Sequence, residues 1–134
     1  MNLVSVHRVK EACKILYDLL KTRTPDVNIS HKEMPSYDEH RKFFATFPYR
    51  EWDLIQVDDV WIGAIYLTYS SEIGIALFPD YRGKHYGPDA ITLFMSKHPT
   101  TRFLANINPN NEASIKTFQS LGFKLIQHTY EKTT

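Results

Sequence analysis

The feature that most restricts the fold is a strand, helix, strand order in the second half of the chain. Residues 72–78 form a short, mainly apolar run, and residues 88–97 carry apolar side chains at helical spacing behind a proline that suits a first helical turn. Residues 102–107 are again short and largely apolar. A crossover of this length makes its two strands parallel neighbours in one sheet. The chain is therefore predicted to contain a parallel strand pair within an α/β fold.

The remaining elements are predicted to surround that pair. Strands are expected over residues 3–6, 52–57, 60–69 and 123–130, and helices over residues 12–20, 37–47 and the segment that Asn111 caps. Local signals mark several ends: Asp58-Asp59 is a hairpin turn, Ser36 and Glu39 have capping-box spacing, and Gly122 suits a helix C-terminus. The order predicts a mixed, mostly antiparallel α/β sheet covered by helices, in a single domain over residues 1–134.

The composition is that of a globular domain and argues against several kinds of partner. Hydrophobic residues are 43% and charged residues 23% of the chain, and 16 Lys and Arg against 15 Asp and Glu give a net charge of +1. Because no basic run and no long apolar segment occurs, neither nucleic acid nor a membrane is expected as a partner. The single Cys13, the start of the chain and the scattered histidines predict a cytoplasmic protein without a structural metal.

The segment with the clearest chemistry is residues 77–88, a strand that turns through Gly83 and Gly87 directly into a helix. The first amides of a helix lack intrahelical partners and lie at the positive end of its dipole, so such a turn can bind an anion. Glycine allows a phosphate to approach the backbone closely. Taken alone, the pattern favours an ordinary strand-to-helix turn, because short glycine patterns are weak signals.

Two motifs together give the chain a family resemblance. Arg82, Gly83 and Gly87 follow residues 79–81 as in motif A of the GNAT acyltransferases, although His85 stands where that family has its central glycine. A second family element, Asn-x-x-Ser-Ile-x-x-(Tyr or Phe)-x-x-x-Gly-Phe, is filled by Asn111, Ser114, Ile115, Phe118, Gly122 and Phe123. The chain resembles the GNAT N-acetyltransferases over nearly its whole length.

The resemblance implies a cofactor, acetyl-CoA, and a place for it. In this family two central parallel strands splay apart, helices cover both faces, and the pantetheine arm pairs with the open strand edge. The resemblance puts the backbone of Ile75, Ala76 and Leu77 beside pantetheine, Asn111 near the thioester half of the arm, and Phe118 beside the sulfur. The residues that would hold the pyrophosphate are Gly83, Lys84, His85, Tyr86, Gly87 and Pro88.

The implied reaction is acetyl transfer to a primary amine, of a small molecule or a protein, by direct attack in a ternary complex. Glu72 is a candidate base, alone or through water, and its other interpretation is a solvated strand end. Asn106 stands where some relatives have a glutamate, and because it cannot take a proton it is expected to orient water or substrate. Phe118 lacks the hydroxyl of the tyrosine that serves as acid in many relatives. The alternative function is therefore a GNAT-like module that binds CoA or a protein without turnover.

The acceptor and the oligomeric state are less constrained by the sequence. Trp61, Tyr66 and Tyr69 can wall an acceptor pocket or be half-buried sheet residues, and in this fold the pocket is expected to involve residues 21–47. Relatives usually close the sheet with two strands after the last helix, where this sequence has room for one. An exposed edge is normally covered or paired, so a homodimer through the C-terminal region is expected.

Overall fold

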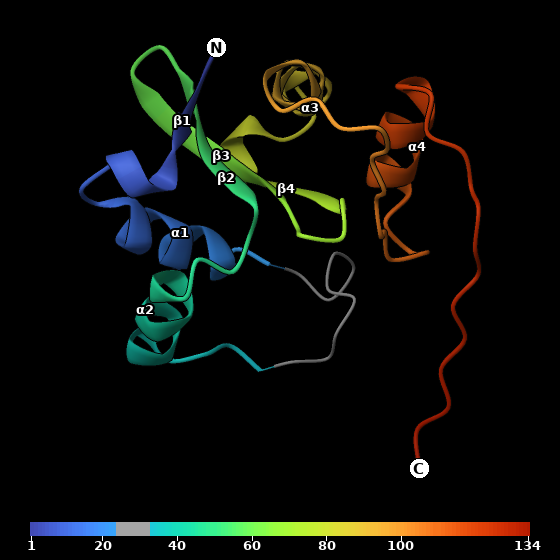
Figure 1. The fold of residues 1–134 in the computed structure, drawn as a ribbon, viewed down its shortest axis with the longest axis horizontal. Helices are drawn as coiled ribbons and strands as arrows, with labels where there is room; N and C mark the ends of the chain where they lie inside the picture. Colours follow the sequence, from blue (N-terminus) through green and yellow to red (C-terminus); the bar gives the residue numbers. More distant parts are fainter. Residues whose placement is uncertain (24–32) are drawn as a thin grey trace.

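The computed structural model describes residues 1–23 and 33–134, and its centre is a four-stranded sheet in the order β1-β2-β3-β4 (Figure 1). The strands are β1 Asn2–Ser5, β2 Glu51–Val57, β3 Val60–Leu67 and β4 Ile73–Leu77. Each strand runs antiparallel to its neighbour. β1 and β4 are therefore the two edges of this sheet.

Helices cover both faces of the sheet. They are α1 Ala12–Leu20, α2 Tyr37–Ala45, α3 Tyr86–Lys97 and α4 Glu112–Ser120, with short 3-10 turns η1 Val6–Arg8 and η3 Pro79–Tyr81. One core cluster joins α1 and α2 to side chains such as Leu54 and Trp52, and the other joins α3 and α4 to Ile55 and Ile65 on the opposite face (Figure 1). The predicted mixed α/β architecture is confirmed. Within the described residues no helix is long and apolar enough to cross a bilayer.

Local sequence signals are found where they were predicted. The Ser36 hydroxyl accepts a hydrogen bond from the Glu39 amide, and the Glu39 carboxylate accepts one from the Ser36 amide, which completes the capping box. Asp58 and Asp59 have φ of 50° and 63°, as a two-residue hairpin turn between right-twisted strands requires. All of these determinants lie within a few residues of one another, which is why the sequence alone reveals them.

Two helix ends differ from the prediction for backbone reasons. α3 begins at Tyr86, two residues before Pro88, with His85 as its N-cap. Pro88 still lies in the first turn, where an amide has no intrahelical acceptor, so the proline costs no hydrogen bond there. α2 ends at Ala45 because Phe47, with φ of 52°, has left the helical conformation before Pro48.

Residues 102–107 form less of a strand than predicted. They meet β4 at one parallel bridge, where the Ile73 amide donates to the Leu104 carbonyl at 2.7 Å and the Leu104 amide to the Ser71 carbonyl at 2.8 Å. Phe103 and Ala105 pack against the core cluster of α3, so side-chain burial holds the segment without a continued ladder. The parallel pair is thus present as a single contact, beyond which the two segments separate.

Residues 123–130 were predicted as a last strand, and this is wrong for the chain by itself. They are extended, but no ladder joins them to the other described residues. Leu125, Ile126 and Tyr130 are 74%, 67% and 91% exposed, and Figure 1 shows the segment leading away from the sheet after α4. A strand needs a neighbour, and an alternating pattern does not specify which chain supplies it.

Candidate active site

β4 presents backbone hydrogen-bonding groups at an open sheet edge. The Phe78 amide donates to the Ile62 carbonyl at 2.8 Å, and strand alternation then directs the backbone groups of Ala76 toward β3 as well. The backbone groups of Ile75 and Leu77 point to the other side, where the described part of the chain supplies no second strand. Ile75 therefore offers its outward amide and carbonyl to a ligand and Leu77 its outward amide, whereas the backbone groups of Ala76 are directed toward β3. The Leu77 carbonyl accepts from Arg82.

The loop that follows β4 is fastened by Arg82. Its Nε donates to the Leu77 carbonyl at 3.0 Å, and its Nη2 donates to Thr22 Oγ1, after the end of α1, at 3.2 Å. Gly83 next to it has φ of 71°, a left-handed conformation that a side chain would strain. These two motif residues shape the path from the open edge into α3.

The N-terminus of α3 is an open cradle of amides. At Gly83 and Gly87, apart from the adjoining backbone, no atom of the described residues lies within 4 Å of the place a Cβ would occupy, so these residues leave room for a ligand beside the backbone. Helix-start amides facing such a space suit a phosphate or pyrophosphate. Pro88 has no amide proton, so the donors predicted for this turn reduce to the amides of Gly83, Lys84, His85, Tyr86 and Gly87.

His85 adopts a backbone conformation that usually favours glycine. Its φ is 66° and its ψ is 7°, in the left-handed region, and its side chain makes no cap hydrogen bond. A non-glycine residue is strained there, although histidine tolerates the region better than most residues do. The backbone of the turn is thus preserved without the glycine, and an imidazole is added beside the anion cradle.

The two side chains predicted for catalysis lie together at the end of the open edge. Glu72 pairs with Leu104 in the parallel bridge, and Asn106 follows two residues after Leu104 on the same face. The Asn106 side-chain amide donates a hydrogen bond to the Glu72 carboxylate. The carboxylate is therefore oriented where β4 and residues 102–107 begin to separate.

An aromatic pair that the sequence did not reveal stands beside this carboxylate. Tyr66 pairs with Gly74 across β3 and β4, and a Cβ at position 74 would collide with the end of the Tyr66 ring. Tyr49 stacks on Tyr66, with ring centroids 4.1 Å apart and an interplanar angle of 12°. A glycine inside a strand pattern often marks a close approach of another group to the backbone. Gly74 is therefore the sequence signal that could have indicated this contact.

Burial sets the ionisation of these two phenols. It raises the pKa of Tyr49 to about 12, with a further contribution from Tyr66. Burial also raises the pKa of Tyr66, and the negative charge of Glu72 acts in the same direction while Arg23 opposes it. Both hydroxyls are protonated at neutral pH. Of the other predicted wall residues, Trp61 packs near the core and the Tyr69 hydroxyl donates to the Phe47 carbonyl at 3.1 Å.

Asn111 and Phe118 both make contacts that stabilise α4. The Asn111 carboxamide oxygen accepts from the Ser114 amide at 3.2 Å as the predicted N-cap. Phe118 is 5% exposed and meets Phe123 edge to face, with centroids 5.0 Å apart. Gly122, directly before Phe123, has φ of 92° and ends α4 with a Schellman turn. Contact of Asn111 and Phe118 with a cofactor stays a prediction, as does the acceptor region, of which residues 24–32 lie outside the described residues.

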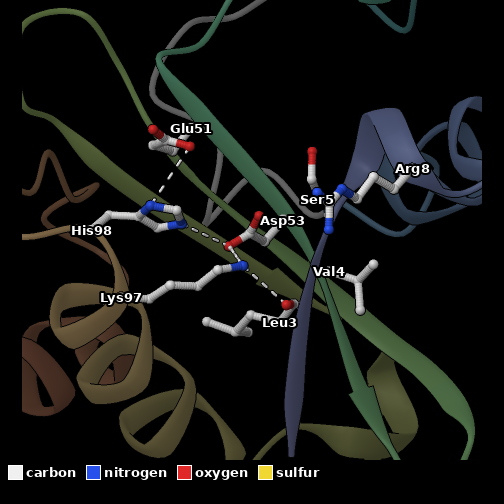
Figure 2. A pocket seen from close by; sticks show the side chains of 8 residues that line it. All are labelled: Leu3, Val4, Ser5, Arg8, Glu51, Asp53, Lys97 and His98. Atoms are coloured by element: carbon white, nitrogen blue, oxygen red, sulfur yellow. Dashed lines mark hydrogen bonds and ion pairs between the residues drawn. The ribbon is translucent and has the colours of Figure 1, made fainter.

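A groove of about 510 Å³ lies at the far edge of the sheet and has no sequence motif (Figure 2). There Asp53, which is 1% exposed, accepts from Lys97 Nζ at 3.2 Å and lies 3.0 Å from His98 Nε2. Lys97 Nζ also donates to the Leu3 carbonyl at 3.0 Å. These contacts tie the end of α3 to β1 and β2, so we interpret the cluster as structural. No group of three or more His, Cys, Asp or Glu in residues 1–23 and 33–134 is arranged to hold a metal.

Solved structures with the same fold are acetyltransferases or domains of unstated activity. A domain from Methanocaldococcus jannaschii is 21% identical, with a TM-score of 0.80 over 97% of this chain and 92% of that one. A chimera of the spermidine N-acetyltransferase SpeG from Vibrio cholerae and hSSAT is 15% identical, with a TM-score of 0.74 over 96% and 84%. The Campylobacter jejuni N-acetyltransferase PseH, in complex with acetyl coenzyme A, is 16% identical, with a TM-score of 0.67 over 96% and 91%.

Sequence comparison gives the family directly. No curated protein sequence matches the chain. The model of the acetyltransferase (GNAT) domain, however, matches residues 16–124, a range that includes the open β4 edge, the glycine turn and α4. With most of its length matched and the fold shared, this chain belongs to the GNAT acetyltransferase family.

Proposed function

We propose that the protein transfers an acetyl group from acetyl-CoA to a primary amine by direct attack in a ternary complex. One arrangement carries the proposal: the amides at the start of α3, the outward backbone groups of Leu77 and Ile75, and the carboxylate of Glu72 follow one another along the β4 edge. Acetyl-CoA has a pyrophosphate and a thioester joined by an amide-bearing arm, which matches that order of groups. The acetyl coenzyme A bound to PseH, a structure with the same fold, supports the choice of donor.

In this proposal the chain contributes binding, orientation and a proton acceptor. The amides from Gly83 to Gly87 hold the pyrophosphate, and Ile75 and Leu77 pair with the arm as an added strand would. The acyl group then reaches the end of β4 nearest Glu72. The Glu72 carboxylate, held by Asn106, takes the ammonium proton directly or through one water. Positioning of the two reactants supplies much of the rate.

The acceptor class follows from the carboxylate and the aromatic rings beside it. Glu72 attracts a cationic amine, and the phenol of Tyr66, stacked on Tyr49, lies beside it. The spermidine acetyltransferase among the structures of this fold makes polyamines the first acceptors to examine. A lysine-containing peptide represents the alternative of a protein acceptor.

The test combines turnover and binding. Thiol release from acetyl-CoA is followed with spermidine, a set of small primary amines and a lysine peptide, and acetyl-CoA binding is measured by calorimetry. Release that depends on one of these amines supports the proposal. Tight binding without release from any amine contradicts it and favours a CoA-binding module. That second candidate is favoured by Phe118, which has no hydroxyl and packs against Phe123.

We also propose that the active form is a homodimer. Residues 123–130 are extended and expose Leu125, Ile126 and Tyr130, while the backbone of residues 102–107 bridges β4 at Leu104 alone. Within the described residues, one chain thus carries both an extended segment without a neighbouring strand and a second segment that can pair with one. A two-fold pair of chains satisfies both by placing each tail beside residues 102–107 of the other.

A further inference from the structure

Tyr66 places a hydroxyl group directly over the backbone of β4. It pairs with Gly74, and a Cβ at that position would collide with Cζ and Oη of the phenol, so the ring lies flat across the strand. Glu72 is two residues before Gly74 and therefore projects from the same face of the sheet. The negative charge of Glu72 acts on the Tyr66 hydroxyl, as expected for neighbours on one face.

The ring is held firmly while its hydroxyl is uncommitted. Tyr49 stacks on it at 4.1 Å, and Trp52 pairs with Tyr66 from the other side in β2. Among the described residues no hydrogen bond engages the Tyr66 hydroxyl, whereas the Tyr17 hydroxyl donates to the Pro35 carbonyl at 2.9 Å. The Tyr66 ring is half-buried, and its hydroxyl can donate to a ligand that lies beside β4.

The path proposed for acetyl-CoA ends at this hydroxyl. Outward backbone groups at Leu77 and Ile75 lead along β4 toward the bridge at Glu72. From Leu77 to Gly74 the strand advances about 10 Å, at about 3.3 Å per residue. An arm that begins at the α3 amides and follows this edge passes Leu77 and Ile75 and then reaches Gly74, over which Tyr66 lies.

We propose that Tyr66 is a catalytic residue whose hydroxyl donates a hydrogen bond to the carbonyl oxygen of the thioester, an assignment that rests on the proposed acetyl transfer. As the amine nitrogen bonds to the carbonyl carbon, negative charge gathers on that oxygen, and the phenol stabilises it. The carbon–sulfur bond then breaks and the thiolate leaves with the electron pair. Glu72 has taken the ammonium proton before the attack, the attacking nitrogen passes its second proton through water to the leaving thiolate, and Tyr66 keeps its own proton throughout.

The ionisation of Tyr66 suits a hydrogen-bond donor better than a proton donor. Burial raises its pKa, so the phenol is protonated over the pH range in which an amine attacks. Phe118, by contrast, can donate nothing. The assignment places a hydroxyl at the reacting group from β3, the strand next to β4, and not from α4.

The decisive experiment compares wild-type protein with Tyr66→Phe, which removes the hydroxyl and keeps the ring. With the best amine of the panel, kcat is expected to fall at least about tenfold, in the direction seen when one oxyanion donor is lost, while KM for acetyl-CoA changes less than about twofold. Tyr17→Phe, which also loses a hydroxyl but lies away from β4, is the matched control and keeps wild-type kcat. A Tyr66→Phe enzyme with wild-type kcat overturns the assignment.

A spectroscopic readout separates this inference from the proposed reaction. Acetyl-CoA labelled with carbon-13 at the carbonyl is bound to each protein, and its carbonyl stretch is measured by difference infrared spectroscopy. The band is expected at lower frequency in wild-type protein than in Tyr66→Phe, because a hydrogen bond weakens the carbonyl bond. Equal frequencies overturn the role of Tyr66 even if turnover occurs. Absence of turnover with the frequency difference intact overturns acetyl transfer and leaves the Tyr66 contact standing.

Discussion

The side-chain amide of Asn106 donates a hydrogen bond to the carboxylate of Glu72, beside the bridge that joins β4 to residues 102–107. The bridge fixes the relative position of the two backbones, and the hydrogen bond then fixes the carboxylate. A negatively charged group is thereby held at the mouth of the open β4 edge. In the proposed reaction this is where an ammonium must lose its proton before it can attack.

Replacing Glu72 with Gln tests this relationship. The Gln side chain keeps the shape and can still accept a hydrogen bond from Asn106, but it cannot take a proton, so kcat is expected to fall about 100-fold. Acetyl-CoA affinity by calorimetry should change little, since the cofactor contacts lie at Ile75, Leu77 and the α3 amides. Asn106→Ala, which removes the hydrogen bond to the carboxylate but leaves the carboxylate in place, should lower kcat less than Glu72→Gln does. An equal or larger loss in Asn106→Ala would contradict the assignment of Glu72 as base.

The sequence predicted features whose causes are local and missed those that depend on a distant partner. The Ser36 capping box, the Asn111 cap and the Gly122 C-terminus each depend on residues within five positions, and all are present. The strand pattern of residues 123–130 is equally clear, yet no ladder joins them to the other described residues. Side-chain alternation predicts a strand without specifying its neighbour.

The same reasoning explains what was missed at the site. Glu72 is a candidate because it begins the strand predicted to line the cofactor site, and Asn106 because it stands where some relatives have a glutamate. Their mutual hydrogen bond is formed only once the crossover brings the two segments together. Tyr49 lies before β2 and carries no motif, so its stacking on Tyr66 follows only from the fold. Gly74 indicates in the sequence that some side chain lies close to the backbone there, and the structure shows that this side chain is Tyr66.

Replacing His85 with Gly is expected to stabilise the protein. The left-handed conformation costs an L-residue about 1–2 kcal/mol, and the added chain entropy of glycine offsets part of that, so the net gain is about 0.5–1 kcal/mol. Thermal unfolding should therefore shift upward by about 2–4 °C. Lys84→Gly is the matched control, since Lys84 does not have positive φ and should lose stability. A lower melting temperature for His85→Gly would contradict the prediction that the left-handed conformation of His85 destabilises the protein.

The stability of the protein is expected to depend on His40 at mildly acidic pH. His40 is 6% exposed, its Nε2 has no hydrogen-bond partner among the described residues, and burial lowers its pKa below the usual 6.5. Between that lowered pKa and 6.5 the unfolded chain binds more protons, so the free energy of unfolding rises with pH across the window and levels off above it. Urea unfolding from pH 5 to 7.5 measures this slope.

A variant isolates the contribution of His40. His40→Leu cannot take up a proton, so its free energy of unfolding should vary less with pH over the same window than that of the wild type. His128→Ala changes an exposed histidine and should leave the slope as it is. If the free energy of unfolding varies with pH in the same way in His40→Leu and in wild-type protein, the buried imidazole does not cause the pH dependence.

The cluster in Figure 2 is expected to matter for stability and not for cofactor binding. Asp53→Ala removes a buried acceptor from Lys97 and His98, and loss of hydrogen bonds to charged groups costs about 2–3 kcal/mol. Asp38→Ala breaks an exposed ion pair with Arg41 and should lower the free energy of unfolding much less than Asp53→Ala does. Urea denaturation measures both. A loss of acetyl-CoA affinity in folded Asp53→Ala protein would contradict the structural interpretation of the groove.

The exposed tail gives the sharpest test of the homodimer. Leu125→Asp and Ile126→Asp together put charge on side chains that are 74% and 67% exposed, so the isolated chain should fold as before. In a dimer the same charges would be buried at the pairing of the tail with residues 102–107, and dissociation is expected. Sedimentation at micromolar concentration should then show dimer for wild-type protein and monomer for the variant. Because the tail would lie beside the segment that carries Asn106, the monomer should also have a lower kcat than the dimer. If the wild-type protein sediments as a monomer and is catalytically active in that state, the proposed homodimer is ruled out.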